Sequence, residues 1–150
     1  MAKLYVMVGL PGSGKSTYAK KLSNEINAKI VSSDDIRIEL FGIDKKVPNS
    51  KKVFKEMRKR IYSYLSQDIN VICDATNVSI EKRASFLARD CSELANSKIA
   101  IVVNRDIDTC KKQNAQREES QRVPIVAIYT LAKNFVFPTL NEGFDEIKEV

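Results

Sequence analysis

The feature that most constrains this chain is a glycine-rich segment close to its N-terminus. Residues 9–17 read Gly-Leu-Pro-Gly-Ser-Gly-Lys-Ser-Thr, which matches the phosphate-loop pattern G-x-x-x-x-G-K-[ST] in full. An apolar run at residues 4–8 precedes the segment, and apolar residues at helical spacing (Ala19, Leu22 and Ile26) follow it. A glycine-rich turn that ended in Lys-Ser by chance would lack both flanks. We therefore expect a buried strand, a phosphate loop and a helix.

The residue types of this loop suit a nucleoside triphosphate and a divalent cation. Glycines let the backbone turn tightly and bring its N–H groups close to phosphate oxygens. Lys15 is expected to reach the β- and γ-phosphates, and the Ser16 hydroxyl to coordinate Mg²⁺. The helix that begins at Lys15 points its positive dipole end at the same anions. ATP and Mg²⁺ are thus the expected cofactors. The expected nucleotide-binding residues lie in the loop and the first helical turn: Gly12, Ser13, Gly14, Lys15, Ser16 and Thr17.

Strands and helices are predicted to alternate along the rest of the chain. The predicted strands cover residues 4–8, 28–31, 71–73, 99–103 and 144–150, and those at 4–8, 71–73 and 99–103 are apolar throughout. Further helices are predicted at 35–41, 51–67, 80–94, 108–116 and 124–136, with a loop at 44–50. Strands that are apolar on both faces indicate a parallel sheet with helices on both sides. The sequence predicts an α/β fold in one domain, residues 1–150.

Composition excludes several classes of site. The chain has no histidine and only three widely spaced cysteines, so neither a zinc site nor a disulfide framework is expected. Without histidine, either a carboxylate acts as general base or the chemistry depends on positioning and electrostatics alone. The net charge of +6 suits a polyanionic partner, although charge of this size also serves solubility. No apolar run approaches the roughly 20 residues that span a bilayer. We expect a cytoplasmic protein that does not bind membranes.

Two carboxylates are expected at the sheet edge that also carries the phosphate loop. Asp74 directly follows the apolar strand at 71–73, as in a Walker B strand, and is expected to hold Mg²⁺ with Ser16. Asp34 follows the second predicted strand, where a carboxylate can orient an acceptor hydroxyl and take its proton. Arg37, one helical turn later, can hold an acceptor phosphate. An equally good interpretation is a helix cap at Asp34 and a solvated arginine.

A charged segment between two predicted helices contains Arg117 and Arg122. The planar guanidinium makes bidentate contacts and is suited to a phosphoryl group in transfer. If this segment folds over the nucleotide as a lid, at about residues 114–124, these arginines reach the phosphates. In the competing interpretation the segment is an exposed loop in which Glu118 and Glu119 pair with the arginines. Spacing alone does not decide between the two.

These segments, taken in order, resemble the polynucleotide 5′-kinase branch of the small P-loop kinases. The matching pieces are GLPGSGKST at 9–17, SSDDIR at 32–37, DATN at 74–77, and the arginine-bearing segment that leads into Val-Pro at 123–124. The resemblance spans residues 4 to about 135. It implies a P-loop NTPase fold of nucleotide-kinase type, in which a five-stranded parallel sheet of order 2-3-1-4-5 carries helices on both faces and a lid.

The resemblance also implies roles for single residues. By position in the D-x-x-R pattern, Asp34 matches the general base and Arg37 the contact to the acceptor's phosphate. Asp35 follows directly, so an assignment shifted by one residue stays open. Arg117 best matches the lid arginine that contacts the donor phosphates, and Arg122 is the second candidate. Kinases of this type often carry a phosphatase or ligase module, so further end repair is expected to need a separate partner.

The acceptor is the open part of the prediction. The helix at 51–67 carries six basic residues near its start and middle against Glu56, which suits a phosphate backbone or, equally, a solvated face. We expect a nucleic-acid 5′ end as acceptor. The first alternative is a nucleoside or metabolite kinase. The second is an ATPase switch without an acceptor, which the sequence favours less because Asn77 follows the Walker B strand and no acid comes before Glu81.

Overall fold

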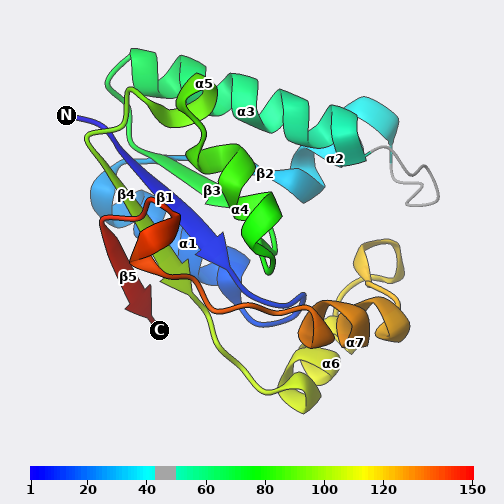
Figure 1. Ribbon diagram of the computed structural model, residues 1–150. Coiled ribbons are helices and arrows are strands. Elements are labelled where there is room, and N and C mark those ends of the chain that lie inside the picture. The colour runs from blue at the N-terminus through cyan, green and yellow to red at the C-terminus, as the bar shows by residue number, and fades with distance from the viewer. Residues whose placement is uncertain (43–49) are drawn as a thin grey trace.

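The computed structural model describes residues 1–42 and 50–150. Within these residues, five strands form one parallel sheet with the order β2-β3-β1-β4-β5 (Figure 1). The predicted nucleotide-kinase-type sheet is therefore confirmed, including its C-terminal edge strand. The strands are β1 (Lys3–Val8), β2 (Lys29–Ser32), β3 (Val71–Asp74), β4 (Ser97–Val102) and β5 (Glu146–Glu149).

The central strand β1 shows why the strands are apolar throughout. Its side chains alternate between the two faces of the sheet, as they do in any strand. Leu4 and Val6 pack into the core on one face, whereas Tyr5 and Met7 pack into the core on the other. Because helices cover both faces, neither set of side chains meets water.

Helices cover both faces of this sheet (Figure 1). Helix α1 (Lys15–Ile26) packs on one face through Ala19 and Leu22. On the other face lie α3 (Ser50–Ser66), α4 (Ile80–Leu87) and α5 (Arg89–Ser92), and α2 (Ser33–Phe41) packs beside α3. The buried stripe of α3 recurs at helical spacing: Val53, Met57, Ile61 and Leu65.

The single helix predicted at 80–94 is wrong, because the chain breaks it into α4 and α5. Ala88 between them adopts an extended conformation with ψ of 150°. Such a break frees helical carbonyl groups that need other donors. The Ser92 hydroxyl donates to the Phe86 carbonyl at 2.7 Å, and Lys98 Nζ donates to the Leu87 carbonyl at 3.2 Å. The loop predicted at 44–50 lies outside the described residues, except Ser50, which begins α3.

The segment after β4 crosses the carboxyl edge of the sheet. It contains α6 (Ile107–Ala115), a short 3₁₀ turn at Glu119–Gln121 and α7 (Ile125–Lys133), which ends three residues earlier than predicted. Asn114 ties the ends of the intervening turn together, because its amide group donates to the Val123 carbonyl and accepts from the Val123 N–H. We call residues 114–124 the lid. Among the described residues, no helix combines the length and apolar character that crossing a membrane requires.

Candidate active site

The phosphate loop connects β1 to α1 and has the backbone conformation that its glycines permit. Gly12 and Gly14 have φ of 81° and 91°, in the left-handed region that side chains with a Cβ rarely adopt. A Cβ on Gly12 would also collide with the backbone oxygen of Cys110 in α6. The loop is held to the end of β3 by the Gly9 N–H, which donates to the Thr76 carbonyl at 2.9 Å. The loop therefore sits between α6 and the end of β3.

The helix that follows the loop lacks the side-chain cap that α2, α4 and α6 possess. The side chains of Ser32, Ser79 and Asp106 each accept a hydrogen bond from a first-turn N–H group of α2, α4 and α6. By contrast, α1 starts after Gly14, which has no side chain to offer. The first N–H groups of a helix need a partner. Those of α1 are thus available to an anion such as a phosphate.

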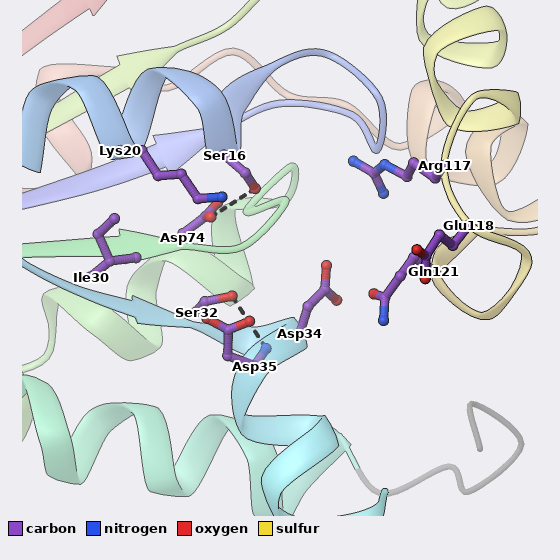
Figure 2. Close-up of a pocket in the computed structure, with 10 residues that line it drawn as sticks. All are labelled: Ser16, Lys20, Ile30, Ser32, Asp34, Asp35, Asp74, Arg117, Glu118 and Gln121. Carbon is purple, nitrogen blue, oxygen red and sulfur yellow. Dashed lines mark hydrogen bonds between the residues drawn. The ribbon is translucent and has the colours of Figure 1, made fainter. Parts of the chain in front are cut away.

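Lys15, Ser16 and Asp74 form a buried polar group at the base of the loop. The Ser16 hydroxyl donates to Asp74 Oδ2 at 2.9 Å, as Figure 2 shows. Burial lowers the pKa of Lys15, the charge of Arg117 acts in the same direction, and Asp74 and Asp34 oppose both. Burial likewise raises the pKa of the Asp74 carboxyl against the opposing effects of Lys15 and Ser16. For both groups, the neighbouring opposite charges do not fully offset the cost of burial. A bound phosphate near Lys15 and a cation near Asp74 would stabilise the charged forms.

The donor set at Asp74 fits Mg²⁺. Asp74 Oδ1 is buried and makes no hydrogen bond within the described residues, although a buried carboxylate oxygen normally has a partner. Mg²⁺ prefers oxygen ligands and is commonly held by one or two protein groups together with phosphates and water. Asp74 and the Ser16 hydroxyl supply such a pair. The described residues contain no cluster of three or more acidic, cysteine or histidine side chains that would form an all-protein metal cage.

Two cavities meet at this group. The smaller one, about 160 Å³, is lined by Lys15, Ser16, Asp34, Asp74 and Arg117 among others. The larger one, about 400 Å³, is lined by Ser16, Asp34, Asp74 and Arg117 again, and extends past Asp35 and Lys20 to the lid.

Two charged side chains reach this space from outside the loop. Figure 2 shows the Asp34 carboxylate extending from the start of α2 into the space between Asp74 and the lid. Arg117 extends from the lid toward the same space. The structure therefore brings Lys15, Asp34, Asp74 and Arg117 around the smaller cavity.

Asp34 and Asp35 differ in position although they are adjacent and both exposed. Asp34 lines both cavities, whereas Asp35 lines only the larger one. The Asp35 backbone N–H donates to the Ser32 hydroxyl at 3.3 Å, which caps α2. This geometry favours Asp34 as the carboxylate that faces the reacting groups.

The other two arginines singled out from the sequence lie differently. Arg122 donates through Nε to the Arg117 carbonyl at 2.8 Å and so contacts the backbone of the lid. Arg37 is half-buried on α2, and it is not among the described residues that line the two cavities. The assignment of Arg37 to an acceptor phosphate stays a prediction.

The cavities include residues that sequence reasoning missed. Lys20 lines the larger cavity because it follows Ser16 by four residues on the same face of α1, a spacing that could have revealed it. Gln121 reaches the same cavity from the lid. A further hollow of about 490 Å³ lies beside Gly14 and contains Arg105, whose guanidinium donates to the carbonyls of Asn104 and Val150. Arg105 belongs to no local motif, so only its place after β4 brings it there.

Asn77, the last residue of the DATN segment, contacts the end of β1 just before the phosphate loop. It is buried, has φ of 47°, and donates through Nδ2 to the Met7 carbonyl at 2.9 Å. The fully buried Arg83 donates to the Asn77 carbonyl at 2.9 Å and pairs with Glu142 at 2.7 Å. This chain of contacts ties β1, the Asp74 turn, α4 and the C-terminal segment together. It positions the site and contacts none of its cavities among the described residues.

Comparison with known proteins identifies the family. The AAA_33 family model, described as an AAA domain, matches residues 4–138. The match covers most of the chain, so the chain belongs to this family of P-loop kinase domains.

Three characterised relatives are kinases. The L-seryl-tRNA(Sec) kinase of Methanococcus maripaludis is 26% identical over 149 residues, which are 95% of this chain and 56% of that protein. The cytidylate kinase of Sulfurisphaera tokodaii is 26% identical over 171 aligned residues, covering 98% of this chain and 92% of that protein. The bifunctional polynucleotide phosphatase/kinase of Schizosaccharomyces pombe is 24% identical over 152 residues, 99% of this chain and 33% of that protein.

A solved structure, the Pnkp1/Rnl/Hen1 RNA repair complex, contains a similar chain. The similarity has a TM-score of 0.76 and 29% sequence identity, and it covers 89% of this chain and 43% of that one. This chain thus spans about half or less of the length of several proteins that it matches. Together these findings support a nucleotide-binding kinase and leave the acceptor to be argued.

Proposed function

We propose that this chain transfers the γ-phosphate of ATP, with Mg²⁺, to the 5′-hydroxyl of a polynucleotide. The observation that carries the proposal is that Lys15, Asp34, Asp74 and Arg117 line one cavity of about 160 Å³. Phosphoryl transfer needs cations on the phosphates, a metal ligand and a group that takes the proton of the acceptor. These four side chains supply all three.

On the donor side, the proposed work is binding and charge neutralisation. The uncapped N–H groups of α1 and the Lys15 ammonium hold the β- and γ-phosphates. Asp74 and Ser16 hold Mg²⁺, which when bound neutralises charge on the phosphate oxygens. Arg117 approaches from the lid and forms charge-assisted hydrogen bonds to the oxygens of the phosphoryl group in transfer.

On the acceptor side, Asp34 is proposed to orient the hydroxyl and accept its proton. A bond forms between the acceptor oxygen and the γ-phosphorus, while the bond from the γ-phosphorus to the β–γ bridging oxygen breaks. ADP leaves with that electron pair, and the proton on Asp34 passes to solvent. Because Asp34 is exposed, it exchanges this proton with water without a relay.

Three observations support a nucleic-acid acceptor. The DATN and D-x-x-R segments resemble those of polynucleotide 5′-kinases, and the relative from Schizosaccharomyces pombe is a polynucleotide phosphatase/kinase. The similar solved chain comes from an RNA repair complex. The cavity beside Asp34 is open to solvent on the acceptor side, as a long acceptor requires, because Asp34 and Asp35 are both exposed.

A second candidate is a kinase that acts on a nucleotide or another small molecule. The cytidylate kinase relative favours it, since that protein is matched over 92% of its own length. The two candidates share the donor side and differ only in what faces Asp34.

The test is transfer of label from γ-labelled ATP with Mg²⁺ to a panel of acceptors. The panel contains 5′-hydroxyl DNA and RNA oligonucleotides, the same oligonucleotides with a 5′-phosphate, nucleosides, CMP, and no acceptor. We expect label only on 5′-hydroxyl oligonucleotides. Label on nucleosides or CMP alone supports the second candidate, and phosphate release without any acceptor indicates an ATPase.

A further inference from the structure

A groove lies between α3 and α4, on the sheet face opposite α1 and outside the two cavities described above. It has a volume of about 480 Å³. Its floor includes Phe54, which packs edge-on against Phe86 with the ring centroids 5.9 Å apart. Glu81 is the one acidic residue among its described lining. The lining also contains four basic side chains, those of Lys51, Lys55, Arg58 and Lys82.

The groove combines an apolar surface with a cationic rim. A lysine side chain adds an aliphatic stem to such a surface and a positive charge to its rim. The ammonium group of Lys82 lies 6.0 Å from the centroid of the Phe54 ring. A ligand with flat apolar groups and regularly spaced negative charges complements such a surface, and single-stranded nucleic acid has both.

The remaining basic residues of α3 are arranged differently. Arg60 pairs with Glu39 at 2.6 Å and with Glu56 at 3.0 Å. Lys52 and Lys59 are exposed and are not among the described lining residues of the groove. The basic residues that face the groove thus form a local set, distinct from an evenly charged helix.

The groove opens toward the carboxyl edge of the sheet. Helix α3 ends just before the start of β3, so the last residues of α3 lie at the amino edge of the sheet. The first residues of α3 therefore lie at the carboxyl edge of the sheet (Figure 1). Helix α4 begins six residues after Asp74, at the same edge. The ion pair between Arg60 and Glu39 fastens α3 to α2, the helix whose first turn carries Asp34. The groove and the start of α2, which carries Asp34, therefore lie at the same edge of the sheet.

We infer that the groove between α3 and α4 binds the single-stranded nucleotides that follow the acceptor's 5′ end. This inference rests on the proposed function, and it adds a binding site for the part of the acceptor that follows its 5′ end. Phe54 stacks against a base, and the lysines contact phosphates.

The test measures binding of 5′-hydroxyl single strands by fluorescence anisotropy over a range of salt concentrations. The variant Lys51→Gln/Lys55→Gln is compared with Lys52→Gln/Lys59→Gln, which removes the same charge from the same helix outside the groove. For a strand of about 12 nucleotides, we expect the groove variant to bind about tenfold more weakly and its salt slope to fall by about 1.4, because each phosphate contact on a single strand contributes about 0.7. The control is expected to lose less than about twofold.

Length and base stacking sharpen the test. The loss in the groove variant should be smaller for a strand of about three nucleotides, which is too short to fill the groove. Phe54→Leu keeps an apolar side chain against Phe86 and removes the stacking surface, so we expect about fivefold weaker binding with a melting temperature close to that of the parent.

Equal losses in the two lysine pairs would overturn the inference, because they would indicate a general field effect. Displacement of the strand by polyglutamate of equal charge concentration would overturn it in favour of an acidic peptide. If the parent labels oligonucleotides while the two pairs behave alike, the groove is wrong and the proposed function stands. If the parent labels none while only the groove pair loses binding, the groove binds single strands that are not acceptors, and the proposed function fails.

Discussion

The donor half and the acceptor half of this site are held in different ways. Lys15, Asp74 and Asn77 of the donor half are buried and lie between β1, β3 and α1. Asp34 of the acceptor half is exposed at the start of α2, and Arg117 stands on the lid. Donor groups are thus part of the core, so substitutions there change folding and nucleotide binding together. Acceptor groups are set on the surface, so substitutions there should change catalysis with little effect on folding.

The two lid arginines give the largest contrast that we expect in activity. Arg117→Gln should lower kcat about 1,000-fold, or about 4 kcal/mol, because it removes a cation from the phosphoryl group in transfer. Arg122→Gln should lower it less than about tenfold, because its Nε contacts the lid backbone. Both should melt near the parent temperature. Steady-state kinetics with melting curves test this, and an equal loss of kcat in both would contradict the assignment of Arg117.

The buried Arg83 should give the largest effect on stability. Arg83→Gln leaves Glu142 without its partner and frees the Asn77 carbonyl, which should cost about 3 kcal/mol of unfolding free energy. The control is Arg89→Gln, whose side chain is 93% exposed and pairs with Glu93 at 3.7 Å, and it should cost less than about 0.5 kcal/mol. Urea unfolding measures both. A loss at Arg83 no larger than that at Arg89 would refute the support network.

Asn77 tests whether the donor half depends on that network. Asn77→Ala should lower the free energy of unfolding by about 2 kcal/mol. It removes the hydrogen bond to the Met7 carbonyl, and it places alanine at φ of 47°, a left-handed conformation that asparagine tolerates better than alanine does. Asn77→Gly relieves the backbone strain and loses the same hydrogen bond, so it should cost about 1 kcal/mol and weaken nucleotide binding as much as Asn77→Ala. Calorimetry with ADP and Mg²⁺ measures the binding. If Asn77→Gly binds nucleotide like the parent, Asn77 does not position the loop.

The pH dependence of nucleotide binding should show the effect of burial on the donor half. Burial raises the pKa of Asp74, so this carboxyl becomes protonated, and Mg²⁺ binding is lost, at a higher pH than for an ordinary aspartate. Burial lowers the pKa of Lys15, so its charge is lost at a lower pH than for an ordinary lysine. The binding optimum should therefore be narrow on both sides. At low pH, protonation of Asp74 and protonation of the nucleotide phosphates both weaken binding. Asp74→Asn should remove the first contribution and leave the second. A loss of affinity at low pH that is the same in the variant and the parent would contradict this account.

Much of the donor half could be predicted from the sequence because its signals are local. The loop pattern directly follows its apolar strand, and Asp74 directly follows the apolar residues of β3, so each signal can be recognised within a few residues. The break at Ala88 was not predictable, because the apolar spacing of 80–94 continues across it. The carbonyl groups that the break frees accept hydrogen bonds from Ser92 in α5 and from Lys98 in β4.

The acceptor half and the lid were only partly predictable, because their residues are far apart in the sequence. Spacing could not separate Asp34 from Asp35 or Arg117 from Arg122, and the two members of each pair differ in the cavities that they line. Likewise, the charge of α3 was visible in the sequence, but its separation into a groove set and a solvated set depends on the packing of α4. The roles of these residues stay proposals that the experiments above address.

The most direct test of the account compares Asp34→Asn with Asp35→Asn, two adjacent exposed carboxylates with the same change. Nucleotide binding and single-turnover transfer to a 5′-hydroxyl oligonucleotide are measured on the same preparations. We predict that Asp34→Asn binds ATP like the parent and transfers about 1,000-fold more slowly, whereas Asp35→Asn retains transfer within about tenfold. Transfer at the parent rate by Asp34→Asn, or a larger loss in Asp35→Asn, would contradict the claim that Asp34 is the base of this site.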